Sequence, residues 1–376
     1  MNVWIAPASD PGAARPITQE TSRPIQRYSW SADGRYVLYA QDTAGDENFR
    51  LYAVDPRSGA SRSFAPDRAS RTDIYAVSPR KPNVVIVGVN DRDPDFFDIY
   101  AINLQTGERT KIFANTDGYD DFTFDNDLNL RLAYKDNPGG GGVLMRRAAD
   151  GQWSPFQEIA PEDSLTTQPL SFNAAGDTLF WISSEGRDRA ALRATNLDTG
   201  ASRIIGENSK ADVARALFDR TTFEPIAYDV DYLRNEWIGT SPAARRDLLF
   251  LSKRVKGDFN IISQTSDSRT WIVRVDSATS SPADYIFERA KRRLVKLFDE
   301  RPGLNAYRLS AMEAVEIPSR DGLILPSYLT LPAAAGRNGG ERTKQPGPLV
   351  LSVHGGPWAR DEYGYQRFVQ WLADRG

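Results

Sequence analysis

The stretch Asn173-Ala-Ala-Gly-Asp-Thr-Leu-Phe-Trp-Ile182 shows the pattern that decides the fold of most of this chain. Asn173 to Gly176 favours a tight turn, and the apolar run from Leu179 to Ile182 favours a buried strand. Six turn signals of this kind occur, and their starts are 45–48 residues apart. They are Ser31–Gly34, Ser78–Lys81, Asp125–Leu128, Asn173–Gly176, Arg220–Phe223 and Thr265–Ser268.

A second series of turns marks hairpins at a similar spacing. Its members end in Thr-Gly, Ser-Gly or Asp-Gly, and glycine supplies the positive φ that a tight strand reversal requires. The four hairpin signals are Asp55–Gly59, Asn103–Gly107, Ala148–Gly151 and Asn196–Gly200. Two turn series in each unit indicate about four short strands per repeat.

Repeats of 40–50 residues with about four strands each are typical of a β-propeller. The turns mark six complete blades. Asn2–Ala6 and Ala14–Thr18 flank Asp10-Pro-Gly12 and resemble the outer hairpin of a further blade, whose inner strands would precede Met1. We therefore predict a mainly β protein with a propeller over residues 1–300, of about seven blades with the first incomplete.

Composition limits the classes of partner and chemistry. The chain has 376 residues, of which 40% are hydrophobic and 26% charged, and a net charge of −3, so neither nucleic acid nor an anionic membrane is an expected partner. It has no cysteine, which excludes disulfides and thiol nucleophiles. No membrane span or signal peptide is recognisable, so we expect a soluble protein, and the sequence leaves open whether it is cytoplasmic, periplasmic or secreted. No cofactor or metal is expected.

The pattern changes after about residue 300. Met312–Pro318 and Leu323–Leu331 flank Arg320-Asp-Gly322 and predict a hairpin, followed by a polar loop over 333–348. Leu349-Val-Leu-Ser-Val353 then predicts a buried strand that ends at His354-Gly-Gly-Pro357. An amphipathic helix follows, with Tyr365, Phe368, Val369 and Leu372 on its apolar face. This is the order in which an α/β-hydrolase domain begins, so we predict an incomplete one over residues 301–376.

The glycine-rich turn is the candidate site. In an α/β-hydrolase, backbone N–H groups of such a turn hold the oxyanion of the tetrahedral intermediate. His354 is the only histidine, and no Gly-x-Ser-x-Gly occurs. Gly239-Thr-Ser241-Pro-Ala243 half-resembles a nucleophile elbow, but Ser241 followed by proline is the start of a helix. We therefore expect no member of a catalytic triad in the chain, and we expect the chain by itself to be inactive.

Propeller, hairpin, strand, His-Gly-Gly-Pro and helix, in that order, resemble the prolyl oligopeptidase family of serine peptidases. The His-Gly-Gly-Pro form is most similar to its acylaminoacyl-peptidase and dipeptidyl-peptidase branches. The resemblance implies hydrolysis of short peptides, access gated by the propeller, and a Ser-Asp-His triad beyond Gly376. It implies that His354, Gly355, Gly356 and Pro357 form the oxyanion-side loop.

Two alternatives stay open on the sequence alone. One is a stand-alone propeller that acts as a binding module, and the other is an esterase of the same fold. For the piece over 312–376, we expect low stability, with Leu349, Leu351, Phe368 and Leu372 exposed to solvent.

Overall fold

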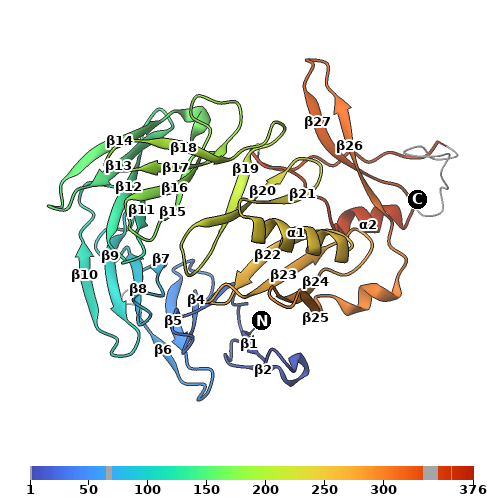
Figure 1. The fold of residues 1–376 in the computed structure, drawn as a ribbon. Helices are drawn as coiled ribbons and strands as arrows, with labels where there is room; N and C mark the ends of the chain where they lie inside the picture. The colour runs from blue at the N-terminus through green and yellow to red at the C-terminus, as the bar shows by residue number, and fades with distance from the viewer. Residues whose placement is uncertain (1, 65–69, 333–345, 357) are drawn as a thin grey trace. The chain divides into compact units, whose positions relative to one another are not determined.

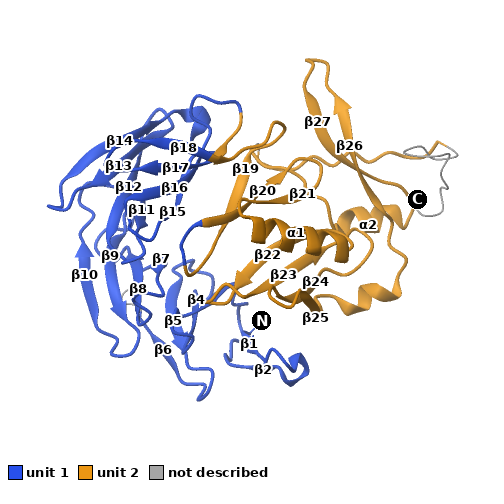
Figure 2. Cartoon of the chain, viewed as in Figure 1, with its two compact units in different colours: residues 1–188, 192–204, 222–224 blue, residues 189–191, 205–221, 225–376 orange. Residues whose placement is uncertain are grey.

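The computed structural model describes residues 2–64, 70–332, 346–356 and 358–376. Nearly all of its regular structure is antiparallel β-sheet (Figure 1). The chain divides into two compact units (Figure 2). Unit 1 comprises residues 1–188, 192–204 and 222–224, and unit 2 comprises residues 189–191, 205–221 and 225–376.

Residues 27–206 form four sheets of four strands each, and within each sheet the strands are neighbours in chain order. The first two sheets consist of β3 (Arg27–Trp30), β4 (Val37–Gln41), β5 (Arg50–Val54) and β6 (Ser61–Ser63), then β7 (Thr72–Val77), β8 (Val84–Val89), β9 (Asp98–Asn103) and β10 (Arg109–Phe113). The next two consist of β11 (Asp121–Phe124), β12 (Leu130–Asp136), β13 (Gly142–Arg147) and β14 (Trp153–Ile159), then β15 (Gln168–Phe172), β16 (Thr178–Ser183), β17 (Ala191–Asn196) and β18 (Ser202–Gly206).

Two further blades follow in residues 213–299. The fifth has only three strands, β19 (Val213–Phe218), β20 (Pro225–Asp231) and β21 (Asn235–Gly239), and the helix α1 (Pro242–Arg254) comes next. The sixth has four strands, β22 (Asp258–Gln264), β23 (Thr270–Asp276), β24 (Ala283–Glu288) and β25 (Arg293–Asp299). The described residues therefore form a β-propeller with six blades, and the predicted incomplete seventh blade is not found among them.

The two differences from the predicted blades have physical causes. The Ser241 side chain accepts a hydrogen bond from the Ala244 amide at 3.2 Å, and Pro242 is the first residue of the helix. Together these two residues start a helix where the fifth blade would have a fourth strand. The N-terminal hairpin pairs only β1 (Trp4–Ile5) with β2 (Arg15–Pro16). Two residues per strand give a small two-stranded sheet rather than a blade.

Both predicted series of turns are confirmed. All six turns of the first series connect the first and second strands of a blade, and all four hairpin signals connect the third and fourth. Side chains at the first series also join neighbouring blades. Asn126 Nδ2 donates to the Asn173 carbonyl at 3.0 Å, and Arg131 Nη1 donates to the Gly176 carbonyl at 2.6 Å. The repeat therefore fixes both the strands and the contacts between successive blades.

The core lies between successive blades. The second strand of the second blade, β8, is buried along almost all of its length, and Val85, Val87 and Val89 pack with Leu38 and Leu51 of the first blade. Trp271, Val273 and Phe287 form a second such cluster in unit 2, together with Leu248 and Leu251 of α1. Burial of such side chains contributes roughly 1.5–3 kcal/mol each.

The C-terminal piece agrees with the prediction only in part. The predicted hairpin is confirmed as β26 (Met312–Pro318) paired with β27 (Ile324–Thr330). Residues 349–353 are not a strand, because no described strand pairs with them, and Leu349 and Leu351 are 83% and 82% exposed. The predicted loop over 333–348 lies largely outside the described residues.

The helix α2 (Arg367–Ala373) forms where a helix was predicted, but with a different buried face. Phe368 is exposed and Leu372 is half-buried, whereas Gln370 is buried. The reason is hydrogen bonding, because the Gln370 amide group bonds to Ser310 N, Ser310 O and Ala278 O at 2.8, 2.8 and 3.0 Å. Three 3₁₀ turns complete the described structure, at Pro11–Ala13, Pro161–Asp163 and Pro302–Ala306.

Candidate functional site

The predicted oxyanion-side loop is exposed in unit 2. The His354 Nδ1 lies 3.0 Å from the Gly355 carbonyl oxygen, so an Nδ1–H tautomer donates to it. Among the residues described, no serine or carboxylate bonds to this ring. Gly356 has φ +144°, and a Cβ there would lie 2.7 Å from the Trp358 amide nitrogen. Glycine is therefore required at 356, whereas Gly355 has open space around it. Pro357 lies outside the described residues.

The segment that follows this loop, residues 360–365, is held firmly against unit 2, and we name it the anchor segment. Arg360 Nη2 donates to the Tyr232 carbonyl at 2.8 Å and lies 3.2 Å from both the Asp231 carboxylate and the Tyr328 hydroxyl. The Arg234 guanidinium lies 3.6 Å from the centre of the Tyr363 ring, a cation–π contact. These contacts fix the chain just after the glycine turn.

Two partly buried carboxylates, Asp231 and Asp276, lie among the anchor segment's contacts. Burial raises the pKa of Asp231 to about 6, although the nearby Arg360 opposes this and Glu362 adds to it. Burial also raises the pKa of Asp276, and this carboxylate accepts a hydrogen bond from the Tyr365 amide at 2.9 Å. Gly364 lies directly against Asp276, since a Cβ there would be 2.7 Å from its carboxyl carbon.

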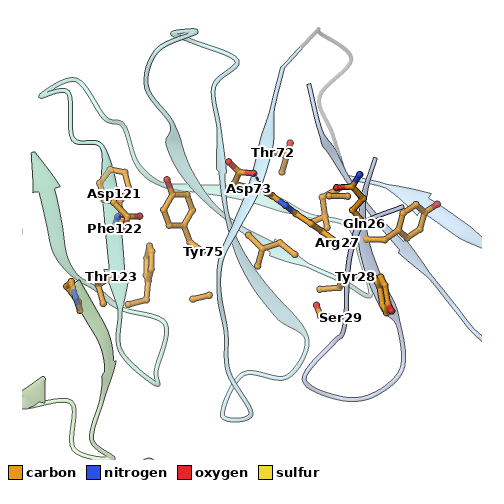
Figure 3. Close-up of a pocket in the computed structure, with 18 of the residues that line it drawn as sticks. Gln26, Arg27, Tyr28, Ser29, Thr72, Asp73, Tyr75, Asp121, Phe122 and Thr123 are labelled. Atoms are coloured by element: carbon orange, nitrogen blue, oxygen red, sulfur yellow. Dashed lines mark hydrogen bonds and ion pairs between the residues drawn. The ribbon is translucent and has the colours of Figure 1, made fainter. Parts of the chain in front are cut away.

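Unit 1 contains a cavity of about 700 Å³ (Figure 3). Its walls come mainly from β3, β7, β11 and β15, the first strands of four successive blades. Sequence reasoning did not single out these residues. The chain has eight tryptophans and fifteen tyrosines, and the sequence alone does not separate those that line a channel from those that pack blades together.

The charged groups of this cavity are unevenly paired. Asp73 has two cationic neighbours, Arg71 at 2.8 Å and Arg27 at 3.8 Å, and Figure 3 shows Arg27 directed toward it. Asp121 has none among the described residues; its carboxylate accepts a hydrogen bond from the Phe122 amide at 2.8 Å. Burial, with a smaller effect of Asp120, raises the pKa of the Asp121 carboxyl group.

Within the described ranges, no three His, Cys, Asp or Glu side chains gather as metal ligands. No helix in the described part of the chain is long and apolar enough to cross a membrane.

Comparison with known proteins gives close relatives of about twice this length, and no family model matches the chain. The chain is 42% identical over 376 residues to dipeptidyl aminopeptidase BIII of Pseudoxanthomonas mexicana, which covers 100% of the chain and 55% of that protein. It is 29% identical to dipeptidyl peptidase family member 6 of Caenorhabditis elegans, over 96% of the chain and 53% of that protein. The chain thus spans about half the length of these relatives.

Solved structures agree on the fold. The acylaminoacyl peptidase of Pyrococcus horikoshii superposes with a TM-score of 0.59 at 13% identity, over 94% of this chain and 56% of that one. This likeness supports the fold described above. The relationship to dipeptidyl aminopeptidase BIII confirms the predicted resemblance to the prolyl oligopeptidase family.

Proposed function

We propose that this chain is the propeller and oxyanion-side part of a serine peptidase that hydrolyses short peptides. The observation that carries the proposal is the 42% identity to a dipeptidyl aminopeptidase over every residue of the chain. The propeller, over 1–300, gates access of peptides, and residues 301–376 begin an α/β-hydrolase domain.

In this proposal, His354 to Pro357 contribute to the oxyanion hole. The glycine requirement at 356 supports this role, because a turn without side chains lets backbone N–H groups approach the developing negative charge. One such donor typically contributes roughly 3–4 kcal/mol to transition-state stabilisation. The anchor segment holds the turn in place from its C-terminal side.

In this proposal the nucleophile and the base are supplied by groups outside residues 1–376. Attack on a peptide carbonyl requires a serine activated by a histidine base. His354 is the only histidine, and its ring faces solvent next to the Gly355 carbonyl. The chain by itself is therefore expected to lack peptidase activity.

Hydrolysis of dipeptide anilides tests the proposal. Two preparations are compared, the chain 1–376 and the longest natural form of the protein that contains it. We expect turnover by the natural form and only background by the chain. A correctly folded natural form that cleaves neither anilides nor simple esters would exclude the peptidase and favour a binding propeller.

A further inference from the structure

Two side chains from adjacent blades meet on one wall of the unit 1 cavity. Tyr75 comes from β7 and Asp121 from β11, and Figure 3 shows the tyrosine ring beside the aspartate. Three phenylalanines hold the Tyr75 ring edge-on, Phe97, Phe122 and Phe124, at centroid distances of 6.5, 5.7 and 6.4 Å. The ring is therefore fixed in orientation, and its hydroxyl has no hydrogen-bond partner among the described residues.

The carboxylates of this wall are unequally paired with cations, since Asp73 has two and Asp121 has none among the described residues. The lining residues include two carboxylates, Asp73 and Asp121, and one cation, Arg27. Arg27 is already engaged, since it faces Asp73 and lies 5.9 Å from the centre of the Phe49 ring. The accessible surface area of Asp121 makes it an exposed residue, yet burial raises the pKa of its carboxyl group. A position on a concave wall explains both properties.

We propose that this cavity binds a positively charged group of a peptide, with the Asp121 carboxylate as counter-ion and the Tyr75 ring and hydroxyl beside it. An ammonium or guanidinium group fits this wall chemically, because it donates hydrogen bonds to a carboxylate and is attracted by a tyrosine ring. The ligand class rests on the proposed peptidase function, but the binding site rests on the cavity alone.

The surrounding charges set the expected pH dependence. The negative charge of Asp121 acts on the Tyr75 hydroxyl, and that of the neighbouring Asp120 adds to the effect of burial on Asp121. Arg27 and Asp73 also line the cavity, and Arg71 pairs with Asp73 from outside the lining. Protonation of Asp121 removes the counter-ion. Binding of a cation therefore weakens as the pH falls through the pKa of Asp121.

Calorimetric titration of the full chain with three tripeptide amides tests the inference and identifies the source of the charge. Acetyl-Ala-Lys-Ala amide carries only a side-chain ammonium. Ala-norleucine-Ala amide carries only an α-ammonium, and its acetylated form carries neither. We expect at least one charged peptide to bind about fivefold or more tightly than the neutral one, and the tighter of the two charged peptides shows which ammonium is bound.

Matched variants assign the effect to the wall. Asp121→Asn keeps the shape and should abolish the preference for charge, and Tyr75→Phe should reduce it by about two- to threefold. Asp120→Asn is the control, because Asp120 is an adjacent carboxylate outside the lining, and it should keep the preference. Thermal unfolding of each variant confirms that it is folded.

Three results would overturn the inference: no binding of any peptide up to millimolar concentration, equal affinities for charged and neutral peptides, or a charge preference that survives in Asp121→Asn. The titration measures binding and does not require that the peptide be hydrolysed. Charge-dependent binding by a protein whose natural form cleaves nothing would therefore reject the peptidase and keep this site.

Discussion

Gly364 is the position where a single methyl group should release the anchor segment. Its φ is +150°, and a Cβ would lie 2.7 Å from the carboxyl carbon of Asp276 and 2.8 and 3.0 Å from its oxygens. The carboxylate would have to move, and its 2.9 Å hydrogen bond from the Tyr365 amide would be lost. We therefore expect Gly364→Ala to open the segment locally without unfolding the propeller.

The expected size follows from two contributions. A hydrogen bond to a charged group contributes about 1.5–3 kcal/mol, and a non-glycine residue in this backbone region costs about 1–3 kcal/mol. With partial relaxation of the segment, we expect Gly364→Ala to lower the free energy of local opening by about 2–5 kcal/mol. Since 1.4 kcal/mol corresponds to a factor of ten, amide exchange in this region should accelerate by at least about thirtyfold.

Hydrogen exchange measured by mass spectrometry is the appropriate assay. Peptides that cover 360–375 should exchange faster in Gly364→Ala, while peptides from β8 should not change. Gly355→Ala is the matched control, because a Cβ at 355 meets no atom within 4 Å. Unchanged protection of 360–375 in Gly364→Ala, or equal loss in the control, would show that the Gly364–Asp276 contact does not hold the anchor segment.

The partly buried Asp231 carboxylate at the anchor segment and a hairpin of unit 1 allow two further tests. The pKa of Asp231 is raised from 3.8 to about 6 in the native state, so its ionised form destabilises that state as the pH rises through this range. Asp231→Asn should therefore gain stability over the wild type most at pH 7, and the gain should shrink as the pH falls to 4. Denaturant unfolding at a series of pH values measures this difference, and a constant or opposite trend would contradict it. Gly141 has φ +66°, and a Cβ would lie 2.2 Å from the Ile159 carbonyl oxygen, whereas a Cβ at Gly139 meets nothing within 4 Å. Gly141→Ala should lose about 2–4 kcal/mol and Gly139→Ala less than about 0.5 kcal/mol, as measured by urea unfolding, and equal losses would count against the close approach.

The propeller was largely predictable because its turns are local. Asn173 to Gly176 and the equivalent turns carry their conformation in a few adjacent residues, so their spacing gave the blades directly. Ser241-Pro242 was also interpretable as a helix start. Whether a helix or a fourth strand follows the fifth blade depends on which apolar face packs on the sheet. The periodicity of the sequence did not show which face this would be.

Other features depend on partners distant in the sequence. Leu349 to Val353 has the composition of a central strand, but a strand exists only where neighbouring strands accept and donate its hydrogen bonds, and none of the described strands does so. The side of α2 that is buried is set by Gln370 and its bonds to Ser310 and Ala278, which apolar periodicity cannot reveal. Tyr75 and Asp121 become neighbours only when two blades pack together. For this reason, the cavity was absent from the sequence-based hypotheses.

We propose that this chain is part of a serine peptidase whose nucleophile lies outside residues 1–376. Labelling of the longest natural form with a fluorophosphonate, followed by peptide mass spectrometry, is the decisive experiment. We expect one labelled serine, within a Gly-x-Ser-x-Gly sequence beyond Gly376, and no labelling of the chain 1–376 by itself. A label on a serine within these residues, such as Ser241, or an unlabelled natural form that still hydrolyses peptides, would contradict the claim.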